Sequence, residues 1–353
     1  MVTSGMICPR GKQSTLVDIT TPDGRDILDR LVKSVDVVVW NGTDRQVHNM
    51  GLDPNGLKVL NPHAIFCKLD CFGGIRRGPL TDQLGYDDLV QVTSGIMLRF
   101  GGSMETPEEH AHVGTIDLLG GCAAALGIAA ALYQKARTGR AGRPRTSLSA
   151  VSGLLQVPLW YDYEGRGPFD EPAGPSAKGY GALTHLYKAA CGRTLMLSAE
   201  ERDLPRLVGV AGLDGLGDVP RDDRTSFLAT TFRKASAEEW LSRLHASDIG
   251  AAICDTLESV RSANTRLADG APGIEQSSYS FSTVFNHPSG VTHVDQYAVR
   301  PAVGNVYTLP PSEKFGASTR EVLGSLGYTE ADIDALIVAG AISESWSPEF
   351  LPS

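Results

Sequence analysis

Short apolar runs alternate with helical patterns in the first part of the chain. Val35–Trp40 (VDVVVW) and Ala64–Leu69 (AIFCKL) are compact and rich in β-branched or aromatic residues, which is typical of buried strands. A helix-like segment, Gly24–Ser34, precedes the first run. The polar segment between the runs, Asn41–Asn61, is rich in Gly, Asn, Asp and Pro and is predicted to be a loop. The alternation favours an α/β fold with a buried parallel sheet.

The clearest helix is predicted at Asp117–Arg137, where alanine, glycine and leucine occupy most positions. Because this helix is small and apolar on all sides, we expect it to be buried, with Cys122 in the core. Neighbouring elements should approach closely over its glycines: Gly120, Gly121 and Gly127.

A change in composition marks the start of a second region. Trp160–Gly181 is rich in Gly, Pro, Asp and Tyr, as is typical of a linker. After it, the pattern predicts a strand at Thr194–Leu197 and a helix at Leu204–Ala211. A further helix is predicted at Ala237–His245, with Trp240 buried.

The last part of the chain predicts a pair of helices. They cover Thr319–Leu326 and Glu330–Val338, after a loop-rich stretch at Asn264–Tyr279. The break at Gly327–Thr329 supplies a glycine that ends the first helix and a threonine that caps the second.

Composition restricts the class of protein. The 353 residues are enough for two domains or one large domain. Apolar residues make up 42% and charged residues 21%, close to the globular average, which argues against a disordered or fibrous chain. The net charge of −9 leaves no basic field for a nucleic-acid backbone or an anionic membrane. We therefore expect neither nucleic acid nor membrane as a partner.

Cysteine usage and the N-terminus indicate the compartment. The six cysteines are scattered and form no C-x-x-C pair, so a zinc knuckle or a dense disulfide framework is not expected. The first 15 residues contain no apolar core of signal-peptide length, and no stretch reaches 18 apolar residues without a charge. The sequence predicts a reduced, soluble, cytoplasmic protein.

One carboxylate, Asp117, stands just before the glycine-rich start of the predicted helix. The unpaired N–H groups and the positive end of a helix dipole would favour its ionised form, and so a nucleophile at neutral pH. An N-cap is the alternative interpretation, because aspartate is among the commonest capping residues. The nearby glycines leave backbone space for a ligand, but a single residue does not decide between the two.

Three other features have ordinary structural explanations. The block Gly73–Pro79 (GGIRRGP) lacks the spacing of a phosphate loop and is predicted to be a surface turn. His110 and His112 have no third ligand at a convincing spacing, so we assign no metal site. Five cations at the end of the predicted helix favour a solvated helix terminus over an anion site: Lys135, Arg137, Arg140, Arg143 and Arg145.

Two segments resemble the class III coenzyme A transferases, also called the CaiB/BaiF family. Gly78–Met97 ends in GYDDLVQVTSGIM, and members carry a tyrosine-aspartate ahead of Q-x-x-S-G. Val113–Ala150 contains VGTIDLLGGCAAALGIAAALYQKARTGRAG, like the family's aspartate before an alanine-rich helix that ends in T-G-R-G. The match continues through AEEWLSRLHASDIGAA and FGASTREVLGSLGYTEADIDALIVAGAI and so covers nearly the whole chain.

The resemblance implies an α/β fold with a Rossmann-like large domain and a smaller α+β domain. It also implies that the C-terminus returns to the large domain and that two protomers form an interlocked dimer. On this pattern the large domain is residues 1–158, followed by a linker at 159–181. The small domain is residues 182–280, and the return segment is residues 281–353.

The resemblance also implies a reaction. Asp117 would be the nucleophile that attacks an acyl-CoA and forms an aspartyl-acyl anhydride, through which CoA reaches a carboxylic acid acceptor. CoA is then a substrate, and no further cofactor is expected. The residues implied to contact CoA are Arg10, Lys12, Asn41, Gly85 and Tyr86.

The chain departs from the family pattern at three places. Members begin with a further strand and helix that help to bind CoA, so we expect weak CoA binding unless a partner domain supplies that part. The family turn E-N-F-R-P-G reads W-N-G-T-D-R, which retains Asn41 and puts Thr43 at the arginine position. The family's T-G-R-G-Q reads T-G-R-A-G at Thr138–Gly142, a milder change. In a related branch, the acyl-CoA racemases, a G-H-D stands where this chain has G-Y-D, and a tyrosine, with an ordinary pKa of about 10, is a poorer proton shuttle than a histidine, at about 6.5.

Transfer is therefore favoured over two alternatives. The first alternative is an acyl-CoA racemase or isomerase. The second is a non-catalytic half of a fused or two-subunit CoA-transferase, which the intact Asp117 motif opposes.

Overall fold

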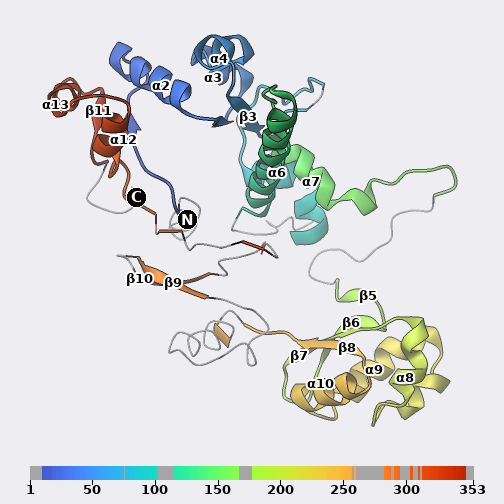
Figure 1. The fold of residues 1–353 in the computed structure, drawn as a ribbon. Coiled ribbons are helices and arrows are strands. Elements are labelled where there is room, and N and C mark those ends of the chain that lie inside the picture. Colours follow the sequence, from blue (N-terminus) through green and yellow to red (C-terminus); the bar gives the residue numbers. More distant parts are fainter. Residues whose placement is uncertain are drawn as a thin grey trace. The chain divides into compact units, whose positions relative to one another are not determined.

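The computed structural model describes residues 10–74, 76–101, 114–166, 177–256, 258–259, 282–287, 290–294, 303–304, 309–310 and 312–346. The chain divides into two compact units (Figure 1). The first unit is made of residues 1–97, 109–164 and 284–353, and the second of residues 98–108 and 165–283. Helices and strands are mixed in both units, so the predicted mixed α/β fold is confirmed.

The predicted apolar runs form a parallel sheet in the first unit. Its strands are β2 (Val37–Asn41), β3 (Ile65–Asp70) and β4 (Arg145–Ser147), in the order β2-β3-β4. Both neighbouring pairs are parallel, with Val39 opposite Cys67. The central strand β3 is buried along most of its length, which explains its continuous apolar sequence.

The polar segment between the first two strands is not a loop, and that prediction is wrong. Helix α2 (Pro22–Ser34) precedes β2, and α3 (Asp44–Asn49) and α4 (Pro54–Leu60) lie between β2 and β3. The polar residues of this segment cap these short helices: Thr43 accepts from the backbone of α3, and Asp53 from that of α4.

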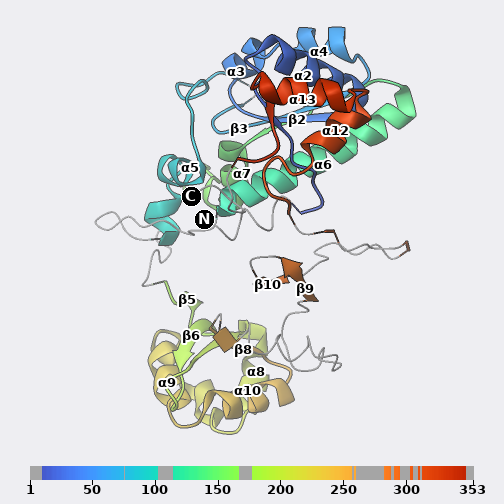
Figure 2. The same cartoon turned by 90° about the vertical axis from the view of Figure 1, so that its left-hand side faces the viewer.

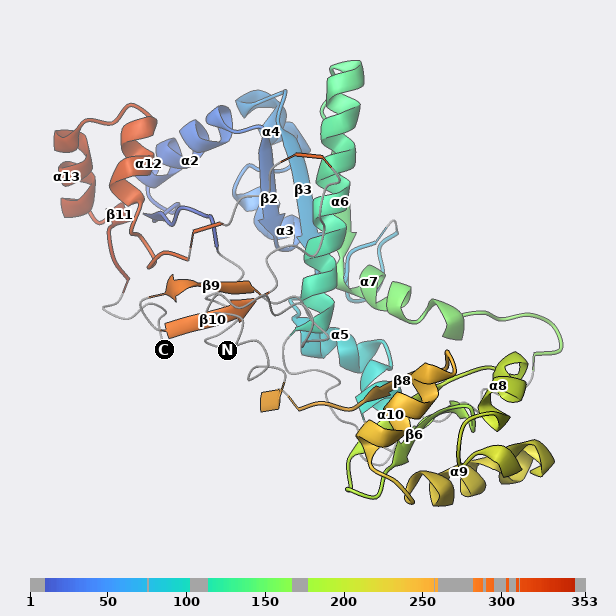
Figure 3. The same cartoon turned by 60° about the horizontal axis from the view of Figure 1, so that its bottom comes forward.

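Helix α6 (Thr115–Thr138) lies alongside β3 in Figure 3 and confirms the predicted helix. Its predicted burial on all sides is wrong within the described chain. One face is buried, whereas Leu126 on the other is 73% exposed and Cys122 is also exposed. Of the helices in the described part, α6 has the length and composition of a membrane span, a property that core helices of soluble proteins share. The buried positions are Ile116, Gly120, Ala124 and Ala131.

The start of α6 is held in a small core of its own. Helices α5 (Asp87–Thr93) and α7 (Leu148–Leu155) both pack against α6, and Figure 3 shows α5 at the lower end of α6. The core joins these three helices to the end of β3 and consists of Cys71, Val90, Ile96, Ile116, Leu148 and Val151.

The C-terminal part of the chain packs on the N-terminal part within the first unit, where Figure 2 shows α12 and α13 near α2. Strand β1 (Leu16–Val17) pairs antiparallel with β11 (Ile342–Ser343). Helices α12 (Thr319–Ser325) and α13 (Glu330–Val338) confirm the predicted pair, and Thr329 caps α13 as expected. The core of this region contains Ile27, Leu323, Ile333 and Ile342.

The second unit contains an antiparallel sheet covered by helices. Trp240 is only 1% exposed, and its indole N–H donates to the Phe232 carbonyl at 2.8 Å, so its predicted burial is confirmed. The predicted strand at Thr194–Leu197 and the predicted helix at Ala237–His245 are confirmed, and the predicted helix at Leu204–Ala211 is present but ends at Val208. The strands are β5 (Gly179–Gly181), β6 (Thr184–Lys188), β7 (Thr194–Ser198) and β8 (Gly250–Ile253), in that order. The helices are α8 (Leu204–Val208), α9 (Arg224–Phe232) and α10 (Ala237–Ala246).

Other predicted segments lie wholly or partly outside the described residues. The loop at Asn264–Tyr279 is outside, as is part of the predicted linker, residues 167–176.

A separate two-stranded sheet pairs β9 (Ser282–His287) with β10 (Gly290–Val294).

Candidate active site

Three parallel strands end at one pocket in the first unit. Asn41 is the last residue of β2, Asp70 is the last of β3, and Leu148 directly follows β4. All three line a pocket of about 280 Å³. Ligands of open α/β sheets bind at the carboxyl ends of the strands, so this is the expected position for a site. The other lining residues are Gly42, Thr43, Gln46, Cys71, Gln83, Leu84, Gly85, Tyr86 and Asp117.

Asp117 lies in the first turn of α6, with its carboxylate at the pocket wall. The helix begins at Thr115, and its N-cap is Gly114, whose φ of 69° is left-handed and favours glycine. A Cβ atom at Gly114 would lie 3.4 Å from Oδ2 of Asp117. The interpretation of Asp117 as an N-cap is therefore wrong, because Asp117 is the third residue of the helix.

The carboxylate that caps α6 belongs to Asp87 at the start of α5. Its Oδ2 accepts from the backbone N–H of Ile116 at 2.6 Å and of Asp117 at 2.9 Å. Its Oδ1 accepts from the side-chain amide of Gln91. Asp87 is 6% exposed and Gln91 is fully buried. Gly114 has no side chain to cap the helix, so a residue from another helix supplies the acceptor.

The pKa of Asp117 is raised above the ordinary value of aspartate. The main cause is that the pocket wall removes its carboxylate from water, and the charges of Asp87 and Asp88 add to the rise. The prediction that the helix N-terminus favours the ionised form is wrong in its net effect. The N–H groups of Ile116 and Asp117 are bonded to Asp87 and do not stabilise Asp117 itself.

Gly85 and Tyr86 form the side of the pocket next to α5. A Cβ atom at Gly85 would lie 2.3 Å from Sγ of Cys71 and 2.7 Å from a ring carbon of Phe72, so only glycine fits without movement. Tyr86 is the N-cap residue of α5 and is 71% exposed. Its phenol is therefore accessible at the rim of the site.

Cys71 is a second potential nucleophile in the pocket wall, but its ionisation is suppressed. Burial, followed by the negative charge of Asp117, raises the pKa of the Cys71 thiol to about 12. A thiol with this pKa is protonated at neutral pH, and the thiolate is the reactive form. Asp117 is therefore the better placed nucleophile of the two.

The turn after β2 departs from the family pattern for a structural reason. Thr43 is buried and forms a capping box with Gln46 at the start of α3. Thr43 thus stabilises the helix where the family has an arginine. Asn41 keeps its place at the end of the strand and lines the pocket.

Asp70, which lines the pocket, belongs to a network of two carboxylates and two cations that the sequence did not reveal. Asp70 lies 3.1 Å from Nζ of Lys68 and 2.8 Å from a guanidinium nitrogen of Arg145. Both cations also contact Asp44 at the start of α3. The only sequence signal for Asp70 is its position directly after an apolar strand.

The structure brings Asn41, Gly85, Tyr86 and Asp117 around one pocket, but not Arg10 and Lys12. The guanidinium of Arg10 donates to the carbonyl of Leu309 at 2.7 Å, in the C-terminal part of the chain. A role for Arg10 and Lys12 in binding CoA stays a prediction.

The remaining sequence features lie elsewhere. His110 and His112 are outside the described residues. In the GGIRRGP block, Arg77 pairs with Asp82. Of the five cations near the end of α6, Lys135 pairs with Asp36 at 3.0 Å, and Arg145 belongs to the charge network around Asp70.

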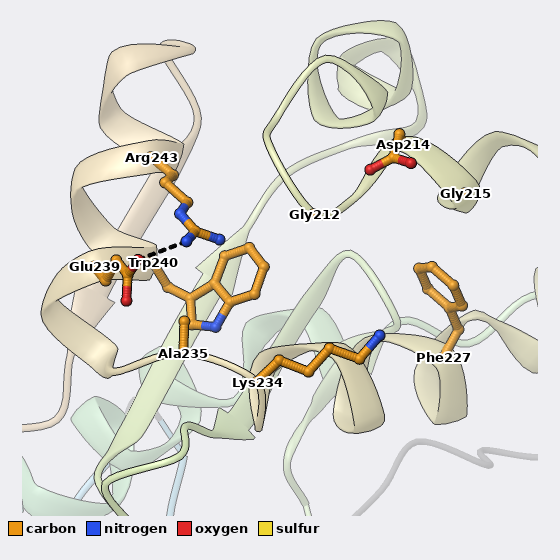
Figure 4. A pocket seen from close by; sticks show the side chains of 9 residues that line it. All are labelled: Gly212, Asp214, Gly215, Phe227, Lys234, Ala235, Glu239, Trp240 and Arg243. Carbon is orange, nitrogen blue, oxygen red and sulfur yellow. Dashed lines mark hydrogen bonds and ion pairs between the residues drawn. The ribbon is translucent and has the colours of Figure 1, made fainter.

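A second hollow, of about 440 Å³, lies within the second unit (Figure 4). Arg243 covers the ring of Trp240 at 4.8 Å, and it donates to Glu239 at 2.6 Å and to the Ala211 carbonyl at 3.1 Å. The charge of Arg243 is therefore matched within the unit. Lys234 adds an ammonium group to the lining, and Asp214 and Glu239 add carboxylates, of which Glu239 is paired with Arg243. The pocket at Asp117 is the better candidate site because three parallel strands end there, which is where open α/β sheets bind ligands.

The fold and this site define a member of CoA-transferase family III, whose family model matches residues 4–299. The chain belongs to this family, so the resemblance seen in the sequence is confirmed. It is 46% identical over 345 residues to the CoA-transferase/lyase DddD of Marinomonas sp. (strain MWYL1), covering 97% of this chain and 41% of that protein. It is 31% identical over 215 residues to the succinate–glutarate CoA-transferase of Agrobacterium fabrum, covering 60% of this chain and 52% of that protein. The chain thus spans about half or less of the length of these relatives.

Solved structures share the fold. A CaiB/BaiF family protein from Brucella suis matches with a TM-score of 0.71 and 23% identity, over 92% of this chain and 84% of that chain. A hypothetical protein from Mycobacterium tuberculosis matches with a TM-score of 0.72 and 21% identity, over 90% and 84% of the two chains.

Proposed function

We propose that this chain transfers CoA from an acyl-CoA donor to a carboxylic acid acceptor, with Asp117 as the nucleophile. The observation that carries the proposal is the position of the Asp117 carboxylate, at a pocket where three parallel strands end. Membership of CoA-transferase family III supports the reaction class. The names of two relatives, both CoA-transferases, support it as well.

In the proposed reaction, an Oδ atom of Asp117 attacks the thioester carbonyl of the acyl-CoA. A bond forms between this oxygen and the acyl carbon, the carbon–sulfur bond breaks, and CoA leaves as a thiolate. The product on the protein is an aspartyl-acyl anhydride. The thiolate then attacks the aspartyl carbonyl of the anhydride, which forms an aspartyl-CoA thioester and releases the donor acid as a carboxylate. The acceptor carboxylate attacks this thioester, giving a second anhydride and free CoA thiolate. Attack of the thiolate on the acceptor's acyl carbon forms the new acyl-CoA and releases the Asp117 carboxylate. A raised pKa of Asp117 supports this role, because a more basic carboxylate is a better nucleophile once ionised.

CoA acts here as a substrate, and no further cofactor is part of the proposal. Asn41, Gly85 and Tyr86 are proposed to contact the CoA thioester, which their place in the pocket lining supports. Arg10 and Lys12 are proposed to bind the more distant phosphates, by charge-assisted hydrogen bonds.

The proposed enzyme is cytoplasmic and works as an assembly, either an interlocked homodimer or a pair with a partner domain. The exposed apolar face of α6 supports an assembly, because such a face on a long helix favours burial against another chain or domain. The 41% coverage of the DddD relative is compatible with a partner domain. The exposed apolar residues of this face include Leu118, Leu126, Leu132 and Tyr133.

A lyase activity is a second candidate function. It is favoured by the 46% identity to a protein named as a CoA-transferase/lyase. A lyase would cleave the acyl group after its attachment to CoA and would release a fragment of it. A transferase would only exchange CoA between two intact carboxylic acids. Analysis of all products by mass spectrometry separates the two activities.

The experiment that tests the proposal is incubation of the chain with succinyl-CoA or acetyl-CoA, followed by hydroxylamine and peptide mass spectrometry. Hydroxylamine converts an activated aspartyl carboxyl into a hydroxamate, so we expect a modified peptide that contains Asp117. Asp117→Asn should abolish the modification. Asp88→Asn is the matched control, because Asp88 is an exposed carboxylate outside the pocket lining. Modification that survives Asp117→Asn would contradict the proposal.

A further inference from the structure

Asp87 is a buried carboxylate whose two oxygens are both occupied. Oδ2 accepts from two consecutive N–H groups in the first turn of α6, and one of these belongs to Asp117. Oδ1 accepts from the fully buried amide of Gln91, one turn further along α5. The side chain thus has one defined orientation, fixed from both helices. A residue held in this way fixes the backbone of the residue it binds.

These bonds act directly on the residue that carries the reaction. The N–H of Asp117 points to Asp87, so the backbone position of Asp117 relative to the pocket depends on Asp87. The same bonds occupy donors that could otherwise stabilise the charged carboxylate of Asp117. The negative charge of Asp87 also lies close to that carboxylate and opposes its ionisation.

We infer that Asp87 is a positioning residue: it fixes the first turn of α6 so that the Asp117 carboxylate faces the pocket. The negative charge of Asp87 acts on the same carboxylate. This inference rests on the proposed function for the role of Asp117. The other groups that act on this region are Asp88 on α5, Asp70 and Cys71 at the end of β3, and Tyr86 at the rim.

The first test measures the pKa of Asp117 without any substrate. A water-soluble carbodiimide labels carboxyl groups in their protonated form, and peptide mass spectrometry gives the labelling of Asp117 against pH. Asp87→Asn keeps the shape of the side chain and removes its charge, so the labelling midpoint of Asp117 should move to lower pH. Asp88→Asn is the matched control: its carboxylate accepts from Leu89 of its own helix at 2.9 Å, and it acts on Asp117 by charge alone. The control should move the midpoint less, and an unmoved midpoint in Asp87→Asn would overturn the inference.

The second test measures the rate at which succinyl-CoA modifies Asp117. Asp87→Asn should lower this rate by about 10- to 100-fold, because small displacements of a reacting group have effects of that size. Asp88→Asn should stay within about threefold of the unchanged protein. Asp87→Glu keeps the charge but moves the acceptor, so it should lower the rate with an unchanged labelling midpoint. An unchanged rate in both Asp87 variants would overturn the inference.

Thermal unfolding establishes that each variant is folded. If one of the two Asp87 variants does not fold, the other still tests the inference. Failure of the proposed function is recognised separately. If Asp117→Asn is still modified by succinyl-CoA, the nucleophile assignment fails. The carbodiimide measurement still decides whether Asp87 controls the ionisation of Asp117, because it uses no substrate.

Discussion

The structure predicts that two neighbouring aspartates differ in what they contribute to stability. The comparison is between Asp117→Ala and Asp87→Ala. An aspartate that caps a helix contributes about 1 kcal/mol. The Asp117 carboxylate accepts no hydrogen bond from the described residues, and its charge is opposed by Asp87 and Asp88. Its removal should therefore change the free energy of unfolding by close to zero.

The removal of Asp87 has a different effect. It leaves the N–H groups of Ile116 and Asp117 and the side-chain amide of Gln91 without their acceptor. A buried donor without a partner costs about 1–3 kcal/mol. Water entering the space left by the carboxylate restores part of this loss, so we expect Asp87→Ala to lower stability by about 3 kcal/mol.

Urea unfolding at neutral pH measures the global effect. A chain with two units can unfold in more than one step, so hydrogen exchange of the Ile116 and Asp117 amides provides a local measurement. Both amides should lose protection in Asp87→Ala and keep it in Asp117→Ala. Asp88→Ala is the matched control and should behave like the unchanged protein. Equal losses of stability in Asp117→Ala and Asp87→Ala would refute the assignment of Asp87 as the capping residue.

Three further predictions concern pH, thiol reactivity and packing. The rate of Asp117 modification by succinyl-CoA should fall with decreasing pH at a higher pH than the ordinary aspartate value of about 3.9, because the raised pKa of Asp117 protonates the nucleophile earlier. A midpoint at or below the ordinary value would contradict this. Alkylation by iodoacetamide, followed by peptide mass spectrometry, should be faster at Cys191, where backbone hydrogen bonds lower the pKa, than at Cys71, with its pKa of about 12. Equal rates at the two thiols would contradict the described environments. Gly85→Ala should lower the melting temperature, since overpacking costs about 1–3 kcal/mol. Gly121→Ala in α6 should raise it slightly, because a Cβ there meets no atom within 4 Å.

The sequence predicted the elements whose pattern reflects local burial. The runs that became β2 and β3 were recognisable because both are apolar and rich in β-branched or aromatic residues. Only β3 is buried along most of its length; Val39 of β2 is 56% exposed, so the predicted burial of that strand is wrong within the described residues. The pair α12 and α13 was recognisable because Gly327 and Thr329 supply local end signals. The short helices α3 and α4 were missed because their caps, Thr43 and Asp53, have the same composition as a loop.

The candidate site was predicted in part, because some of its geometry depends on tertiary contacts. The family motifs pointed to Asn41, Gly85, Tyr86 and Asp117, which do line one pocket. The capping role of Asp87 was not predicted, because it depends on contact between α5 and α6, which the sequence does not encode locally. The burial of α6 was overestimated for a related reason: an apolar composition does not tell which partner covers each face.

The pairing of β1 with β11 determines the order in which the protein can fold during synthesis. Leu16 lies opposite Ser343, and Ile27 shares a core with Leu323, Ile333 and Ile342. The ribosome must reach residue 343 before these partners exist, and closing so long a loop carries an entropic cost. The core of the second unit uses residues from 182 to 253 and is available earlier. Leu28 and Val32 of α2 pack with residues of α3, α4 and β3 that are made early, whereas Ile27 and Leu31 on the same helix wait for α12, α13 and β11. Until those elements emerge, this part of α2 is open to chaperones or to misassociation.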